Sequence, residues 1–229
     1  MTVVTIGPNV FDVKLYPERT LQVGYNVPAA IYLTPGGPSR NIAEALVRLG
    51  QEATLLGVVG DDLAGEVMLA ATARAGVDVS HVQRIGGLPT YTYVALTTAA
   101  GEPFILTDGR IHDHFDAAYF LAVGDMLRAA SVIVIHADLF QHFQAVRAQL
   151  ALPERVRVAL MAKYEDATPA LRAALPTIDW LFLNHREAGR LWGREVGTIA
   201  AAAEAARWLL AQGVRLAIVT RGAEGFVAA

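Results

Sequence analysis

Hydrophobic and polar positions follow two alternating periods along most of the chain, and this alternation predicts strands followed by helices. Short apolar runs rich in β-branched residues predict strands, whereas apolar residues three and four positions apart predict helices. The predicted strands cover residues 1–6, 53–59, 132–135, 156–160, 180–183 and 216–220. The predicted helices cover residues 63–75, 140–150, 168–175, 185–192 and 199–211. Repeated strand–helix–strand order predicts an α/β fold with helices on both faces of a parallel sheet.

Two segments break this rhythm. The stretch 13–33 has β-type patches at 21–25 and 30–33 and no helical period. In the stretch 90–107, two β-type runs flank Ala100-Gly101-Glu102, which predicts a hairpin. Two such excursions predict a small sheet over one end of the α/β body, built from about residues 13–35 and 90–108. We expect the whole chain, 1–229, to form one domain.

The segment after the second β-type patch combines a glycine pair with a helix start. Gly36 and Gly37 allow the backbone to approach a ligand closely, and Pro38 suits a first helical position. Free N–H groups at a helix start favour hydroxyls or anions, and Arg40 and Asn41 are the polar residues of this first turn. The predicted apolar face of the helix consists of Ile42, Ala45, Leu46 and Leu49. A tight turn before a capped helix would explain the same residues.

Acidic residues follow two of the predicted strands. Asp12 lies beyond the first strand, where parallel-sheet proteins bind ligands, and its carboxylate can accept hydrogen bonds from two neighbouring hydroxyls. A plain turn aspartate is an equally good interpretation. Asp62, between strand 53–59 and the next helix, is best explained as a helix N-cap.

Polar residues also follow the last two predicted strands. Asn184 and Glu187 come directly after strand 180–183, and Glu187 can either complement the helix dipole or hold a hydrated Mg²⁺. Thr220, Gly222 and Gly225 follow strand 216–220. A hydroxyl and two glycines suit the approach of a phosphate, and they equally suit a hairpin.

Composition excludes several classes of function. The 229 residues include 19 basic and 22 acidic side chains, a net charge of −3, and no run of basic residues, which argues against nucleic-acid binding. The absence of cysteine excludes disulfides, thiolate metal sites and cysteine nucleophiles. No signal peptide is recognisable, and the longest apolar run, near 129–137, is too short to span a bilayer. We therefore expect a cytoplasmic protein without membrane partners.

Histidines provide the remaining polar candidates. His112-Asp113-His114 could contribute to a metal site, but without a third or fourth ligand a solvated loop is favoured. His136 ends strand 132–135 and could face a ligand, although a buried histidine of the core or its rim is the stronger interpretation.

Five short motifs occur in a fixed order along the chain. They are Gly-x-Asn-x-x-Asp at 7–12, Gly-Gly-x-x-x-Asn at 36–41, Gly-Asp-Asp-x-x-Gly at 60–65, Asn-x-x-Glu-Ala at 184–188 and Thr-x-Gly-x-x-Gly at 220–225. In this order they resemble the ribokinase-like, or phosphofructokinase-B type (PfkB), family of carbohydrate and nucleoside kinases. The resemblance runs through essentially the whole chain. The string Gly-Gly-Pro-Ser-Arg-Asn-Ile-Ala-Glu-Ala-Leu looks closest to the pseudouridine kinases within that family.

The resemblance implies a doubly wound, mostly parallel sheet with a small β-sheet lid that commonly forms a homodimer interface. It implies an ATP-dependent phosphotransferase that acts with Mg²⁺ on a hydroxyl of a sugar or nucleoside. The residues implied in substrate binding are Asp12, Gly36, Gly37, Asn41 and Tyr93. Those implied around ATP are Asn184, Glu187, Thr220, Gly222 and Gly225, with Glu187 acting on Mg²⁺ through water. Packing within the lid is the alternative role for Tyr93.

One family motif is missing from the sequence. Family members carry a late Asp-Thr-x-Gly-Ala-Gly-Asp string, whose glycines form an anion hole and whose last aspartate is the catalytic base. No Gly-Ala-Gly-Asp occurs in the 229 residues, so no catalytic residue is assigned and we expect the C-terminal part of the fold to be missing through truncation. Such a loss would expose apolar surface and favour lower stability or an oligomer.

Two other functions compete with an active kinase. A catalytically inactive module of the same fold, used for ligand binding or dimerisation, fits the missing motif. A Rossmann dehydrogenase fits poorly, because the first strand is not followed by Gly-x-Gly-x-x-Gly and a helix.

Overall fold

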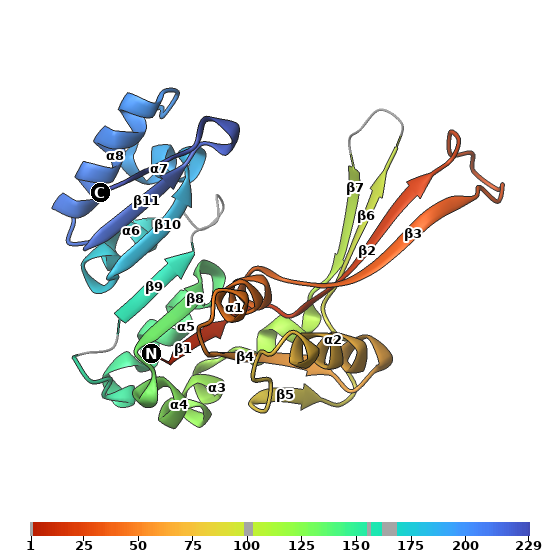
Figure 1. Cartoon of the computed structure of the whole chain (residues 1–229), viewed down its shortest axis with the longest axis horizontal. Helices are drawn as coiled ribbons and strands as arrows, with labels where there is room; N and C mark the ends of the chain where they lie inside the picture. The colour runs from red at the N-terminus through yellow and green to blue at the C-terminus, as the bar shows by residue number, and fades with distance from the viewer. Residues whose placement is uncertain (1, 99–102, 155–156, 162–168) are drawn as a thin grey trace. The chain divides into compact units, whose positions relative to one another are not determined.

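The computed structural model describes residues 2–98, 103–154, 157–161 and 169–229 (Figure 1). Contacts divide the chain into two compact units: unit 1 comprises Met1–Ile6 and Phe120–Ala229, and unit 2 comprises Gly7–Tyr119. The predicted hairpin turn at Ala100-Gly101-Glu102 lies outside the described residues, as do Val156 and Thr168, the first residues of two predicted elements. The prediction of a single domain stays a prediction.

Unit 1 contains strands in the order β12-β11-β10-β9-β8-β1, all parallel except for β12, which runs antiparallel to β11. The bounds are β1 (Val3–Ile6), β8 (Val132–His136), β9 (Arg157–Met161), β10 (Trp180–Asn184), β11 (Leu216–Thr220) and β12 (Phe226–Ala228). Every residue of β8 is buried, as expected for a β-branched run covered on both faces. The sequence prediction of a mostly parallel sheet is confirmed.

Helices connect these strands. Their bounds are α4 (Gly124–Ala129), α5 (Ala137–Leu150), α6 (Pro169–Ala174), η2 (Leu175–Thr177), α7 (His185–Trp192), α8 (Ile199–Ala211) and η3 (Gly222–Glu224). Helix α3 (Ala117–Ala122) contains the residue at which unit 2 ends and unit 1 resumes. Helix α8 shows why the sequence pattern predicted helices. The Thr198 hydroxyl caps its first turn, and one face of the helix is buried through Ala202, Ala205, Ala206 and Leu209. None of the described helices is long and apolar enough to cross a membrane.

Unit 2 combines a helix-covered strand pair with a small four-stranded sheet. The pair is β4 (Ala53–Gly60) and β5 (Val82–Ile85), which are parallel, accompanied by α1 (Pro38–Arg48), α2 (Leu63–Arg74) and η1 (Arg110–His114). The small sheet has the order β3-β2-β6-β7, with β2 (Val10–Pro17), β3 (Ala29–Gly36), β6 (Thr92–Thr97) and β7 (Pro103–Asp108). Pairing is antiparallel except between β2 and β6.

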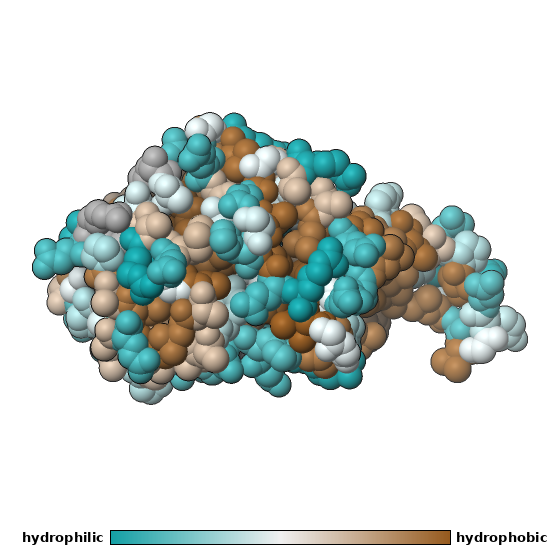
Figure 2. Space-filling model, turned by 90° about the horizontal axis from the view of Figure 1, so that it is seen from below, coloured by the Kyte–Doolittle hydropathy of each residue, from teal (hydrophilic) through white to brown (hydrophobic). Residues whose placement is uncertain are grey.

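The register of the small sheet separates two faces of different chemistry. Residues that pair across neighbouring strands share a face, and successive residues alternate between faces. What we call the polar face carries Asp12, Lys14, Tyr16, Tyr32, Thr34, Tyr93 and Thr107, with Ala95 and Ile105. What we call the apolar face carries Val13, Leu15, Ile31, Leu33, Val94, Leu96, Phe104 and Leu106. Four of these apolar residues are more than half exposed, namely Ile31, Leu33, Phe104 and Leu106. Brown hydrophobic atoms gather at the right of Figure 2, where this sheet lies.

The structure corrects the prediction for the start of unit 2. Residues 21–25 are not a strand but the turn of the β2–β3 hairpin, in which Gly24 has a φ of +83° and Val23 is fully exposed. The sequence prediction missed β2 itself. As a result, Asp12 lies within a strand of the small sheet and not in the loop that follows β1.

The buried face of α1 also differs from the prediction. Ser39, Arg40 and Ala43 are its buried residues, whereas Leu49 is 79% exposed. Burial of a cation is possible here because Arg40 forms an ion pair with Glu44 and donates a hydrogen bond to Thr72 Oγ1 at 3.3 Å. The apolar contribution of α1 comes from Ala43, which packs with β4, and from the partly buried Leu46 beside it.

Among the short elements, β5, α3 and α4 carried no sequence prediction, and none of them is longer than six residues. Periodicity needs a longer window to separate helix from strand, so segments of this length give no clear signal.

Candidate functional site

The first group of expected site residues lies in unit 2, where β2, β3 and the start of α1 meet. Asp12 in β2 pairs with Thr34 in β3, and its carboxylate lies against the end of β3. A Cβ added to Gly36 would lie 2.6 Å from Asp12 Oδ2. The absence of a side chain at Gly36 is therefore what makes room for the carboxylate.

Gly37 turns the chain from β3 into α1. Its φ of +98° lies in the region that favours glycine, and an added Cβ would lie 2.2 Å from the carbonyl oxygen of Pro8. Gly37 is the N-cap of α1. No side chain of a described residue accepts a capping hydrogen bond at this end of the helix, and its first turn, which begins with Pro38, contains no acidic residue. The positive end of the helix dipole is thus not neutralised within its own turn.

Asn41 lies one turn into α1 and is exposed. Its side-chain oxygen accepts a hydrogen bond from Arg40 Nη1 at 3.2 Å, and its backbone N–H donates to the Gly37 carbonyl. Arg40, the other polar residue of that turn, points inward to α2 and is not a candidate for ligand binding.

Tyr93 lies directly beside Asp12, because the two residues are paired in the register of β6 and β2. Its side chain is half-buried on the polar face. The structure therefore brings Asp12, Gly36 and Tyr93 together, with Gly37 next along the chain.

A cation that the sequence did not single out completes this group. Lys14 Nζ lies 3.7 Å from Asp12 Oδ2, because residues two apart in a strand share a face. Burial raises the pKa of the Asp12 carboxyl, and the neighbouring ammonium of Lys14 partly offsets this rise. Recognition of β2 as a strand would have predicted the pair from the spacing Asp-x-Lys.

The second group of expected site residues lies in unit 1. Asn184 ends β10 and caps α7: its side-chain oxygen accepts hydrogen bonds from the N–H groups of Arg186 (2.9 Å) and Glu187 (3.0 Å). Glu187 Oε2 in turn accepts a hydrogen bond from the Asn184 N–H at 2.6 Å, which makes a capping box. Glu187 therefore has a capping role at the start of α7, and its side chain is buried; its expected role on Mg²⁺ stays a prediction.

Thr220 ends β11, and its register partner in β10 is Asn184. The carboxyl ends of two neighbouring parallel strands thus carry the first residues of the two late motifs side by side. After Thr220 the chain forms η3 and returns as β12, so the hairpin interpretation is confirmed. Gly222 and Gly225 have φ values of +60° and +91°, and a Cβ on either would meet no described atom within 4 Å. The backbone of this loop is open to a ligand.

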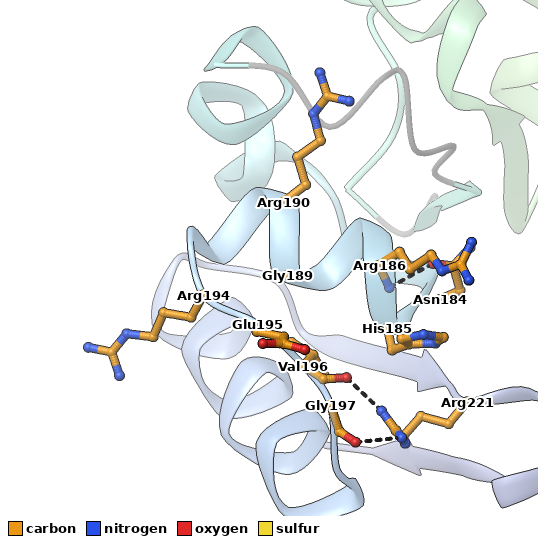
Figure 3. A pocket seen from close by; sticks show the side chains of 10 residues that line it. All are labelled: Asn184, His185, Arg186, Gly189, Arg190, Arg194, Glu195, Val196, Gly197 and Arg221. Carbon is orange, nitrogen blue, oxygen red and sulfur yellow. Dashed lines mark hydrogen bonds between the residues drawn. The ribbon is translucent and has the colours of Figure 1, made fainter.

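A cavity of about 970 Å³ adjoins these residues within unit 1. Its lining includes Asn184 and Arg221 together with His185, Arg186, Gly189, Arg190, Arg194, Glu195, Val196 and Gly197 (Figure 3). In Figure 3 the side chains of Arg190 and Arg194 extend away from Arg221, so the positive charges are spread around the rim. Arg194 lies over the ring of Trp192, with its guanidinium carbon 4.9 Å from the ring centroid.

Arg221 fixes the shape of this cavity. The side chain is buried and donates hydrogen bonds to the carbonyl oxygens of Val196 (2.6 Å) and Gly197 (2.9 Å), and it forms an ion pair with Glu224 (3.0 Å). It thereby joins the loop after β11 to the loop before α8. The sequence placed Arg221 inside a motif without indicating this role, because its partners lie 24 and 25 residues away.

The remaining candidates have structural explanations. Asp62 is the N-cap of α2, as expected, and accepts hydrogen bonds from Gly65 and Thr90. His112 and His114, expected in a solvated loop, lie in the 3-10 helix η1, and no group of three or more potential metal ligands occurs among the residues that the structure describes. His136 is buried at the end of β8 and bonds through Nδ1 to Asp138.

Comparison with known proteins places this geometry in context. A family model described as pfkB family carbohydrate kinase matches residues 2–229. Pseudouridine kinase of Escherichia coli is 30% identical over 224 residues, covering 97% of this chain and 71% of that protein. The uncharacterized sugar kinase YeiI of Escherichia coli is 28% identical over 213 residues, and the match covers 93% of this chain and 58% of that protein.

Solved structures agree on the fold. The structure of Arabidopsis thaliana ribokinase complexed with ribose and ATP superposes with a TM-score of 0.78 at 22% identity, covering 99% of this chain and 73% of that one. The fold is therefore the ribokinase-like α/β fold, with a mostly parallel large sheet and a small sheet. The chain spans between about three fifths and three quarters of the length of these relatives.

Proposed function

This chain belongs to the pfkB family of carbohydrate kinases, and from that premise we propose that it serves an ATP-dependent phosphotransfer to a hydroxyl of a sugar or nucleoside. The observation that carries the proposal is the packing of the Asp12 carboxylate directly against Gly36, next to the start of α1, which has no side-chain cap. A carboxylate, a bare glycine backbone and a helix N-terminus present acceptors and donors to a molecule with several hydroxyls.

In this proposal Asp12 accepts hydrogen bonds from two neighbouring substrate hydroxyls. The backbone at Gly36 and Gly37 approaches the sugar ring closely, Asn41 adds an amide at the rim, and Tyr93 forms a wall beside Asp12. Contacts of this kind hold and orient the hydroxyl that receives the phosphoryl group, which is most of what a protein contributes to such a transfer.

The nucleotide is proposed to bind in unit 1, at the ends of β10 and β11. Gly222 and Gly225 leave their backbone open, and Thr220 and Asn184 supply a hydroxyl and an amide side by side. Several arginines line the adjoining cavity, which supports the proposal of a ligand with several negative charges. The volume of about 970 Å³ is adequate for a nucleotide.

Mg²⁺ is proposed to arrive with the phosphates. It is usually held by one or two carboxylates, the phosphates and several waters, so a single acidic side chain is sufficient. Glu187 fits as that side chain only through water, because its Oε2 is engaged in the capping box. The ion would neutralise phosphate charge during the transfer.

The alternative proposal is a catalytically inactive module of the same fold, which would bind ligands or dimerise without turnover. We assign no catalytic base among the 229 residues, which contain no Gly-Ala-Gly-Asp string.

The experiment compares the chain with a chimera that continues after Ala229 with the C-terminal part of Escherichia coli pseudouridine kinase. ADP release is measured with a panel of sugars and nucleosides. We expect the chimera to turn over at least one of them and Asp12→Ala in the chimera to abolish turnover. Asp61→Ala, an exposed aspartate of the same unit, is the matched control and should keep it.

Calorimetry separates the two functions. Ligand binding without ADP release by either protein favours the binding module. If neither protein binds ATP or any member of the panel, the kinase and the ligand-binding module are both refuted.

A homodimer through the small sheet is the proposed assembly. The apolar face exposes Ile31, Leu33, Phe104 and Leu106, which is more apolar surface than a strand usually leaves in water. A twofold interface places the same patch on both copies, so one apolar face can cover another.

A further inference from the structure

Another cavity of unit 1 lies at the amino ends of β9, β10 and β11, opposite the strand ends at which the nucleotide is proposed to bind. Its volume of about 690 Å³ is within the usual range of small-molecule sites. The walls come from the end of α5, from η2 and from the loops that precede the three strands. None of these residues takes part in the proposed phosphotransfer.

Three arginines reach this cavity from three different segments. Arg147 lies in the last turn of α5, Arg157 begins β9, and Arg215 directly precedes β11. Two of them share one carboxylate oxygen, because Arg157 Nη1 and Arg215 Nε lie 3.5 Å and 3.3 Å from Asp179 Oδ1. The guanidinium groups of Arg157 and Arg215 are therefore close to each other.

Asp179 has a fixed position between the neighbouring strands. Its Oδ2 accepts a hydrogen bond from the Val158 N–H at 2.9 Å. Its carbonyl oxygen accepts hydrogen bonds from the N–H groups of Arg215 (2.9 Å) and Leu216 (3.0 Å). The side chain of Asp179 is 12% exposed. The two arginines thus meet at a carboxylate that the backbone of β9 and β11 holds in place.

The three arginines carry more charge than their partners neutralise. Among the described residues of the lining, the acidic ones are Asp179 and the exposed Glu154. The distances to Asp179 Oδ1 exceed the roughly 2.7–2.9 Å of strong charge-assisted hydrogen bonds. Burial lowers the pKa of the Arg147 guanidinium, and the carboxylate of Asp179 only partly offsets this effect. A further negative charge in the cavity would stabilise all three cations.

Backbone carbonyl groups also face these arginines, since α5 and η2 end here and helix C-termini attract cations. The Thr177 carbonyl oxygen accepts a hydrogen bond from Arg147 Nη1 at 2.7 Å, and the Glu154 carbonyl oxygen accepts one from Arg157 Nη1 at 3.1 Å. Each bond uses one N–H of a guanidinium that has five. The Nη2 groups of Arg147 and Arg157 and both Nη groups of Arg215 donate no hydrogen bond to a described residue, so donors remain for a ligand.

We propose that this cavity binds a small organic molecule through a doubly charged phosphate group, at a site separate from that of the nucleotide. A guanidinium group is planar and donates to two oxygens of a phosphate at once, so neighbouring arginines suit its geometry. The cavity is larger than inorganic phosphate needs. Leu152, Pro153 and Pro176 line the remainder and can contact the carbon skeleton of the ligand.

Calorimetry on the full chain in phosphate-free buffer tests this site with glycerol 3-phosphate, and with succinate as a doubly charged ligand without phosphate. We expect glycerol 3-phosphate to bind with a Kd of about 1 mM or lower, and more tightly than succinate. Arg157→Ala and Arg215→Ala should each weaken its binding about tenfold, the size of effect that one charge-assisted contact has on affinity. Urea denaturation checks that each variant is folded.

Two further arginine variants locate the bound phosphate. Arg207→Ala removes an exposed arginine of α8 in the same unit and is the matched control, which should leave the affinity unchanged. Arg194→Ala changes the lining of the cavity near the carboxyl ends of β10 and β11, and it should also leave the affinity unchanged.

Four outcomes would refute the site. The first is that glycerol 3-phosphate does not bind, or binds equally well to folded Arg157→Ala and Arg215→Ala, because the arginines would then only tie the loops together. The second is weaker binding to Arg194→Ala with Arg157→Ala unchanged, which would place the phosphate in the proposed nucleotide cavity. The third is an equal loss with Arg207→Ala, which would indicate attraction to overall charge. The fourth is tighter binding of succinate. The proposed kinase function depends on none of these results.

Discussion

Replacement of Gly37 by alanine tests whether the turn between β3 and α1 is as tight as the geometry indicates. The new Cβ would lie 2.2 Å from the Pro8 carbonyl oxygen, and the φ of +98° disfavours any side chain. The backbone conformation costs about 1–2 kcal/mol and the displaced backbone about 1–3 kcal/mol more. We therefore expect Gly37→Ala to lower the free energy of unfolding by about 2–5 kcal/mol. For a chain of this size, that is a fall in Tm of roughly 4–20 °C.

Two further alanine variants isolate the contact from the backbone conformation. Gly24 has a φ of +83°, and a Cβ added there would meet no described atom within 4 Å. Gly24→Ala should therefore lower the free energy of unfolding by only about 1 kcal/mol. Gly36→Ala meets the mobile end of the Asp12 side chain and should lower substrate affinity more than stability. Urea denaturation followed by circular dichroism measures the stability of all three variants, and calorimetry with the ligand panel measures the affinity of Gly36→Ala. If Gly37→Ala costs no more than Gly24→Ala, the reasoning from the Pro8 contact is refuted.

Four other variants have defined outcomes. Asn184→Ala removes the capping box and should cost about 1 kcal/mol in urea denaturation; no change would mean that water replaces the cap. Arg221→Ala should cost about 1–3 kcal/mol, because it leaves the buried carbonyl oxygen of Val196 without its donor and removes the part-buried hydrogen bond to Gly197, whereas the exposed Arg215→Ala should cost under about 1 kcal/mol. Burial raises the pKa of Asp12, so protonation favours the folded state and the stability it contributes is lost as pH rises through that pKa. Asp12→Asn should therefore be as stable as the parent chain or more so at pH 7, with the gain absent below about pH 3.8 in parallel urea titrations. Leu33→Arg should convert the proposed dimer to a monomer in light scattering, and an unchanged mass would contradict an interface on the apolar face.

The elements with a strong local signal could be predicted from the sequence. Strand β8 is apolar throughout, and α8 places its alanines and Leu209 at helical spacing under a threonine cap. The two expected groups of site residues also follow from motif order, and the meeting of Asn184 with Thr220 follows from parallel pairing alone. In each case the decisive interactions lie within one element or between neighbouring strands.

The remaining errors have tertiary causes. The alternation of Leu21, Val23 and Tyr25 has the period of a strand, but the left-handed conformation at Gly24 makes the segment a turn. Arg40 is buried with the help of Glu44 in the same helix and of Thr72, a partner 32 residues away that no local pattern of α1 reveals. The pairing of Lys14 with Asp12 could be predicted only once β2 is known to be a strand, and its alternation of apolar and polar residues was not recognised.

The division of the chain also has a consequence for how it folds. Strand β1 belongs to unit 1, yet its partner β8 begins only at Val132, so all of unit 2 is inserted between the two strands. At about 5–20 residues per second, a ribosome needs roughly 6–25 s to make that intervening stretch. During this time the apolar segment Val3–Ile6 has no parallel partner from β8, whereas unit 2 can complete its own hairpins. We expect unit 2 to fold first, and the pairing of β1 with β8, which closes a loop of more than one hundred residues, to come later.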